Sequence, residues 1–171
     1  MAIAFVLNGE RIEVADAAPS MTVLDFLRTR QRLTGTKEGC AEGDCGACTI
    51  AIGLGEGGAQ RWQVANSCIL LLSQIDGAEV TTVEGLTGPS GLHPVQTVLA
   101  ESDGTQCGFC TPGIVMSLYA LVQERAGEAP VSDADIHEAL AGNLCRCTGY
   151  GRVFAAVRTA AAWRRGEAET H

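Results

Sequence analysis

Four cysteines in the first half of the chain have the spacing of an iron-sulfur ligand set. Cys40-x4-Cys45-x2-Cys48 is followed after a longer gap by Cys68, the pattern that holds a plant-type [2Fe-2S] cluster in a loop. The loop "EGCAEGDCGAC" at 38–48 is rich in glycine, which reaches the positive φ needed to curl backbone N–H groups around sulfur. A zinc site is the alternative, but four-cysteine zinc sites usually consist of two short pairs. The spacing therefore predicts an iron-sulfur cluster.

Four further cysteines form two close pairs in the second half, Cys107-x2-Cys110 and Cys145-x-Cys147. Their spacing alone leaves three chemistries open: a second cluster, a zinc site, or a redox disulfide between Cys107 and Cys110. The disulfide leaves Cys145 and Cys147 unexplained, because they are poorly placed to bond to each other without strain. Both can ligate one metal centre, so the four form a second candidate metal site.

Both of these pairs are predicted to lie at helix ends. Thr111-Pro112 indicates an N-cap followed by the first helical residue, which places Cys110 where a helix dipole favours thiolate. Gly142-Asn143 ends the preceding helix, and Thr148 or a near neighbour begins the next one. Backbone donors are unpaired at helix ends, so they can face cluster sulfurs.

Three histidines and two cations were also considered as residues of a metal site. His93, His137 and His171 do not lie at ligand spacing to any cysteine, and we reject them as ligands. Lys37 precedes the first loop and Arg146 separates two cysteines. Either cation could raise a cluster potential, although a solvated surface charge is the plainer interpretation.

Composition narrows the class of protein. The chain has 171 residues and a net charge of -8, which argues against binding nucleic acid or anionic lipid. Its first residues carry no basic leader or long apolar run, so we expect a cytoplasmic protein with no membrane partner. Cytosolic thiols are kept reduced, which favours metal ligation over disulfides for eight cysteines.

The first half is predicted to be a small mixed sheet crossed by one helix. Asn8-Gly9 favours a tight hairpin turn. The helix has Ser20 or Thr22 as its N-cap. A glycine-rich turn at 54–58 joins the two middle strands. The predicted strands are 3–7, 11–15, 49–53, 61–65 and 78–84, and the predicted helix is 21–30.

The second half has helical periodicity and predicts a four-helix bundle. Val115, Leu118 and Tyr119 either form its core or bury against a partner; the core is the simpler interpretation. The predicted helices are 93–102, 112–125, 132–142 and 152–165. We therefore expect a domain at 1–84, a Gly/Pro/Ser-rich linker at 85–91, a helical domain at 92–165 and a polar tail at 166–171.

Four motifs together resemble the iron-sulfur portion of the molybdenum hydroxylases, the family of xanthine dehydrogenase and aldehyde oxidase. They are "TGTKEGCAEGDCGACT", "LHPVQ", "QCGFCTPGIVMS" and "GNLCRCTGY", in that order over nearly the whole chain. The first and third look most like xanthine dehydrogenases. The resemblance implies an α+β chain: a plant-type ferredoxin-like (β-grasp) domain with one [2Fe-2S] cluster, then an all-α four-helix domain with a second.

The resemblance also implies a role. Electrons would pass from a molybdopterin centre to the cluster on Cys107, Cys110, Cys145 and Cys147, then to the other cluster and to FAD. Gln106 and Cys147 match positions that contact the pterin. The sequence stops before any FAD or molybdenum domain, so it resembles either the small subunit of a split enzyme or the N-terminal fragment of a longer chain. In both cases FAD-binding and molybdopterin-binding partners are expected. A subunit of an aldehyde or N-heterocycle oxidoreductase, a free ferredoxin and a zinc module are the alternatives.

Overall fold

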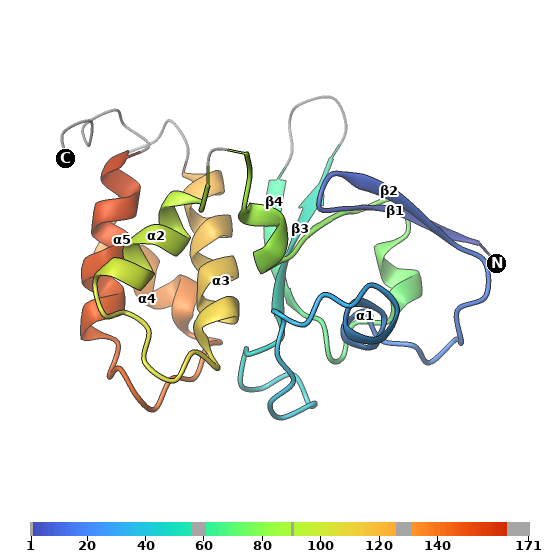
Figure 1. The fold of residues 1–171 in the computed structure, drawn as a ribbon, viewed down its shortest axis with the longest axis horizontal. Coiled ribbons are helices and arrows are strands. Elements are labelled where there is room, and N and C mark those ends of the chain that lie inside the picture. Colours follow the sequence, from blue (N-terminus) through green and yellow to red (C-terminus); the bar gives the residue numbers. More distant parts are fainter. Residues whose placement is uncertain (1, 56–60, 90, 126–130, 164–171) are drawn as a thin grey trace.

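The computed structural model describes residues 2–55, 61–89, 91–125 and 131–163, with the side chains of the last helix described as far as Arg158. Two halves lie side by side, a sheet with one short helix across it and a group of helices (Figure 1). The α+β class predicted from the sequence is confirmed.

A five-stranded mixed sheet forms the first half, in the order β2-β1-β5-β3-β4. Parallel pairing joins β1 to β5, and the other neighbours are antiparallel. The predicted strands are all present, with the last one shorter than expected. Their bounds are β1 Ile3–Leu7, β2 Glu10–Val14, β3 Thr49–Leu54, β4 Arg61–Asn66 and β5 Glu79–Thr81.

Asn8 and Gly9 form the tight turn between β1 and β2, as predicted. Their φ angles are 51° and 86°, the two successive positive values that a type I′ hairpin turn requires and that Asn-Gly tolerates best. Part of the predicted glycine-rich turn at 54–58 lies outside the described residues.

One helix crosses the sheet, where α1 (Val23–Asp25) continues directly into a π-helical segment, Phe26–Arg30. Thr22 is its N-cap, since the Thr22 hydroxyl accepts a bond from Asp25 N at 3.1 Å; the alternative cap, Ser20, was wrong. Phe26 is buried and packs edge-on against Phe5 of β1, with ring centroids 5.7 Å apart. The apolar face of this helix and one face of the sheet thus form the first core.

Four α-helices lie in the described residues of the second half, as predicted: α2 (Pro94–Glu101), α3 (Thr111–Glu124), α4 (Asp133–Leu140) and α5 (Gly151–Trp163). The central helix is α3, which is buried continuously from Gly113 to Ala120. Val115, Leu118 and Tyr119 are all buried in this core. The alternative that they form an exposed docking face was therefore wrong.

The two halves share a packed boundary. On one side α3 contacts both β3 and β4, and the Trp62 ring of β4 lies edge-on to Tyr119 of α3 with centroids 5.3 Å apart. Ala51 of β3 and Leu86 belong to the same buried cluster as the helices. The helical core therefore extends onto the sheet rather than ending at a solvated linker.

Candidate metal centres

The first cysteine loop, residues 38–48, projects beside the N-terminus of α3 (lower centre in Figure 1). Within it the backbone N–H groups of Asp44 and Cys45 each donate to the Cys40 sulfur at 3.4 Å. The N–H groups of Glu42, Cys45 and Asp44 lower the pKa of the Cys40 thiol to about 7. The loop is thus already shaped to stabilise negative charge on sulfur, as the sequence predicted.

Glycine leaves room around these sulfurs. A Cβ placed on Gly39 would lie 2.8 Å from the Cys45 sulfur, closer than a methyl group can approach. Gly43 has a φ of 81°, and its carbonyl accepts a 2.6 Å bond from the side-chain amide of Asn66 at the end of β4. The loop closes around its thiols only because these two positions carry no side chain.

The thiols of the first set lie close enough to shift one another's pKa values. Cys45 adds to the lowering of the pKa of Cys40 by backbone N–H groups, and Cys48 and Cys40 add to the raising of the pKa of Cys68 by burial. Burial, followed by the contact with Cys48, raises the pKa of Cys68 to about 11. A thiol in this position loses its proton readily only when a cation binds beside it.

The thiols of the second set also act on one another, and the neighbouring Cys107 raises the pKa of Cys147. Burial raises the pKa of Cys110 to about 12, and the neighbouring Cys145 adds to the effect. The predicted helix-dipole effect at Cys110 is therefore outweighed by desolvation. Burial also acts to raise the pKa of Cys145, but hydrogen bonds from Thr148 outweigh it and lower that pKa.

Tyr150 shapes the loop that carries Cys145. Its hydroxyl accepts a bond from Cys145 N and donates to the carbonyl of Asn143, both at 2.7 Å. Tyr150 has a φ of 64°, which is strained for an aromatic residue. The two phenol bonds offset this strain and pin the backbone on either side of Leu144.

Both sets fit a binuclear centre. A [2Fe-2S] cluster takes four thiolates, and the thiols within each set lie close enough to shift one another's pKa values. All eight cysteines are free thiols. Four free thiols in each set, backbone donors at the Cys40 sulfur and glycine clearance together suit the cluster.

The first cysteine loop contacts the segment 141–150, which carries Cys145 and Cys147 and is called the second cysteine loop below. The contact centres on the carbonyl of Gly46. That oxygen accepts a 3.1 Å bond from the side-chain amide of Asn143, and Leu144 N donates to the carbonyl of Cys45 at 3.0 Å. A Cβ on Gly46 would collide with the carbonyl of Gly142, and a Cβ on Gly113 of α3 would collide with the carbonyl of Gly46. Backbone thus meets backbone where the loops join.

The remaining residues considered from the sequence lie as follows. Gln106 and Arg146 are exposed, while the Lys37 amine donates to the carbonyl of Thr34 at 2.9 Å. His93 is the N-cap of α2 and accepts from Val95 N at 3.3 Å. His137 packs its ring on Phe154 with centroids 4.4 Å apart. His171 lies outside the described residues.

The start of α3 differs from the expectation by one residue. Cys110 occupies the N-cap position without a side-chain cap bond, and Thr111 is the first helical residue. The Thr111 hydroxyl instead donates to the hydroxyl of Thr105 at 3.2 Å. The prediction that Thr111 is the N-cap was therefore wrong, although Cys110 does lie at the helix start.

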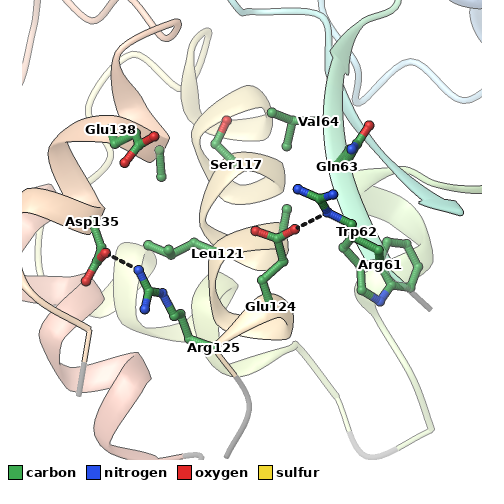
Figure 2. A pocket seen from close by; sticks show the side chains of 12 residues that line it. Arg61, Trp62, Gln63, Val64, Ser117, Leu121, Glu124, Arg125, Asp135 and Glu138 are labelled. Atoms are coloured by element: carbon green, nitrogen blue, oxygen red, sulfur yellow. Dashed lines mark hydrogen bonds and ion pairs between the residues drawn. The ribbon is translucent and has the colours of Figure 1, made fainter. Parts of the chain in front are cut away.

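A cleft of about 470 Å³ is lined by residues of β4, α3 and α4. Figure 2 shows two ion pairs there, Arg61 with Glu124 at 3.6 Å and Arg125 with Asp135. Ser117 lines both this cleft and a smaller hollow of about 170 Å³ that continues to Asn143. No cysteine lines either space, so the cleft is separate from the thiol sets.

Each half matches a model of an iron-sulfur protein family. Residues 5–73 match the 2Fe-2S iron-sulfur cluster binding domain, and residues 82–158 match the [2Fe-2S] binding domain. A chain in the crystal structure of quinoline 2-oxidoreductase from Pseudomonas putida 86 is 37% identical, with 98% of both chains covered and a TM-score of 0.80. The chain belongs to the iron-sulfur proteins of the molybdenum hydroxylase family.

The relatives of this iron-sulfur protein include much longer chains. Xanthine dehydrogenase of Blastobotrys adeninivorans is 45% identical over 96% of this chain, and aldehyde oxidase 1 of Cavia porcellus is 48% identical over 91%. Aldehyde oxidoreductase from Desulfovibrio gigas is 33% identical, with a TM-score of 0.86. This chain spans 12% of the length of those two curated relatives and 18% of the Desulfovibrio gigas chain.

These findings confirm the predicted fold and both cluster-binding domains. Within the part of the chain that the structure describes, no helix is long and apolar enough to cross a membrane.

Sequence reasoning did not identify Asn66, Tyr150 or Ser117. Nothing in their local sequence marks them, because each acts through a bond to another loop.

Proposed function

We propose that the chain is the electron-transfer subunit of a molybdenum hydroxylase and binds a [2Fe-2S] cluster on each set of cysteines. The observation that supports this most directly is that the loops carrying the two sets meet, with Leu144 N bonded to the carbonyl of Cys45 at 3.0 Å, while the thiols within each set shift one another's pKa values. Each set offers the four thiolates that one cluster needs. The proposed ligands are Cys40, Cys45, Cys48 and Cys68 for the first cluster, and Cys107, Cys110, Cys145 and Cys147 for the second.

When bound, the clusters supply one-electron transfer from a molybdopterin centre on the side of the helical half to FAD on the side of the ferredoxin-like half. The residues of this chain position the clusters and adjust their charge environment. Gln106 and Cys147 are the proposed pterin contacts, and both are exposed, as contact with a partner chain requires.

The expected domain boundaries, 1–84 and 92–165 around a linker at 85–91, remain part of this proposal. The two family models support a division in this region. The packing of Leu86 in the helical core places part of the linker against the second domain. FAD-binding and molybdopterin-binding partner chains and a cytoplasmic location complete the proposal; free thiols are consistent with that location.

Xanthine is the proposed substrate of the complex, since xanthine dehydrogenases are among the relatives at 45–46% identity. A second candidate is an N-heterocycle oxidoreductase. It is supported by the likeness to the quinoline 2-oxidoreductase chain, which is 37% identical with a TM-score of 0.80. Aldehyde oxidation is the third possibility.

Metal analysis and spectroscopy test the electron-transfer role. The purified protein should be reddish-brown and contain about four iron and four sulfide per chain. After reduction it should give two distinct rhombic electron paramagnetic resonance (EPR) signals. A colourless zinc protein would refute the proposal, and purification as a stable lone monomer would favour a free ferredoxin.

Co-purification tests the assembly and the substrate. The chain should elute with two larger chains that carry FAD and molybdopterin. Xanthine, an aldehyde and quinoline are then compared as electron donors to the complex. Turnover of the aldehyde or of quinoline alone would overturn the proposal of xanthine.

A further inference from the structure

We infer that Asn143 is a positioning residue whose carboxamide holds both cysteine loops at once, so that its replacement loosens both cluster sites. This inference rests on the proposed ligand sets. It concerns a side chain that is not itself a ligand and lies on the loop after α4.

The Asn143 side chain is 3% exposed and fully engaged. Its amide nitrogen donates to the carbonyl of Gly46 at 3.1 Å and to the hydroxyl of Thr49 at 3.3 Å. Its amide oxygen accepts a 2.7 Å bond from Ser117 of α3. One carboxamide therefore bonds to the first cysteine loop, to β3 and to the central helix.

The backbone of Asn143 is held as firmly from the other side. Its N–H donates to the carbonyl of Leu140 at the end of α4 at 2.9 Å. Its carbonyl accepts from the Tyr150 hydroxyl, which also binds Cys145 N. A shift of Asn143 therefore moves Cys145, and a shift of Gly46 moves Cys45.

Chemistry explains why asparagine suits this position. The carbonyl of Gly46 requires a donor and the Ser117 hydroxyl offers one, so the side chain must donate at one end and accept at the other. A carboxylate of the same size only accepts, and it would place negative charge against the carbonyl oxygen. Thr49 N and the Thr49 hydroxyl also donate to the Gly46 carbonyl, at 3.2 and 2.8 Å, so this oxygen stays paired in Asn143→Asp. The new carboxylate, however, is buried beside acceptor oxygens with no donor at that end, so the substitution should loosen both loops.

Asn66 offers a matched control. It is also a side-chain amide that donates to a carbonyl of the first loop, that of Gly43 at 2.6 Å. Asn66 lies at the end of β4, and none of its described bonds reaches the second loop. Asn66→Asp should therefore disturb the first cluster only.

The experiment follows both EPR signals of the loaded full-length chain while a chelator removes iron. Cys45→Ser and Cys145→Ser variants assign each signal to its loop. In Asn143→Asp we expect both signals to decay about tenfold faster and both sets of g-values to shift. In Asn66→Asp only the first signal should change. Ile136→Val, a conservative substitution in the helical core, should leave both sets of g-values as in the wild type.

A change confined to one signal in Asn143→Asp, or changes in both signals in Asn66→Asp, would overturn the inference. If Asn143→Asp fails to load, Ser117→Ala removes only the bond that orients the amide. It should accelerate the decay of both signals by about threefold, and an effect on one signal or on neither refutes the coupling. The absence of two signals in the wild type would instead refute the proposed function.

Discussion

The backbone amide of Leu144 donates a 3.0 Å hydrogen bond to the carbonyl oxygen of Cys45. Cys45 is a proposed ligand of the first cluster, and Leu144 directly precedes Cys145, a proposed ligand of the second. A single bond therefore links the chain at one ligand to the chain next to another. The Leu144 side chain takes no part in it and is 58% exposed.

Leu144→Pro should be far more damaging than Leu144→Ala. Proline removes the N–H donor and leaves the carbonyl of Cys45 without this partner, whereas loss of an exposed side chain is nearly neutral. We expect the midpoint of thermal unfolding to be lower by about 2–4 °C or more in the proline variant. The midpoint of the alanine variant should stay near that of the wild type. Equal midpoints in calorimetry of the two loaded proteins would contradict a role for the amide.

Gly46→Ala tests the close contact of the two loops, and Gly77→Ala is its control. Both glycines have positive φ, 69° and 75°, so both substitutions carry the same backbone cost of about 1–2 kcal/mol. Only at Gly46 would the new Cβ also collide with the carbonyl of Gly142; at Gly77 nothing lies within 4 Å. We expect Gly46→Ala to lose most of its iron and Gly77→Ala to keep it, as measured by metal analysis.

Cysteine alkylation of the chelator-treated protein should proceed in a defined order. Backbone N–H groups lower the pKa of Cys40 to about 7, whereas burial raises the pKa of Cys68 to about 11 and that of Cys110 to about 12. Thiolate is the reactive form, so at pH 8 Cys40 is largely deprotonated and the other two are not.

Mass spectrometry of peptides after brief iodoacetamide treatment measures this order. The Cys40 rate should rise as the pH increases through about 7 and then level off, and the rates of Cys68 and Cys110 should still be rising above pH 9. A Cys40 rate that keeps rising above pH 9 would show that the backbone donors do not act on its sulfur.

Tyr150→Phe should weaken the second cluster alone. The phenol hydroxyl bonds Cys145 N and the carbonyl of Asn143, and its loss leaves both groups unpaired at a cost of about 1–3 kcal/mol. We expect iron of the second cluster to be released to a chelator about tenfold faster, with little change in the first EPR signal. A larger effect on the first signal would place the role of Tyr150 elsewhere.

Local signals in the sequence predicted much of the fold. Asn8-Gly9 identified the hairpin and Thr22 the start of α1, because both act on neighbouring backbone. Cysteine spacing predicted the chemistry of the first candidate site, whereas spacing alone left the chemistry of the second open. The π-helical segment Phe26–Arg30 was missed, since its apolar residues have ordinary helical spacing.

Long-range contacts were the part that could not be predicted. The bond from Asn143 to Gly46 joins residues that no periodicity relates, and "GN" before "LCRC" indicated only the end of a helix. The expected thiolate at Cys110 followed from the helix dipole alone. The burial of Cys110 reverses the expected direction of its pKa shift. This burial depends on packing that becomes visible only in the folded chain.

Gly113 limits how freely this protein can exchange its parts. The two halves match separate family models, which suggests two modules that evolution could recombine. At Gly113, however, the first turn of α3 lies against the carbonyl of Gly46 with no space for a methyl group. A Cβ on Gly46 would likewise collide with the carbonyl of Gly142, so a ferredoxin-like half with any other residue at this position cannot pack here unchanged. The two halves of this chain are therefore fitted to each other through bare backbone on both sides of their boundary.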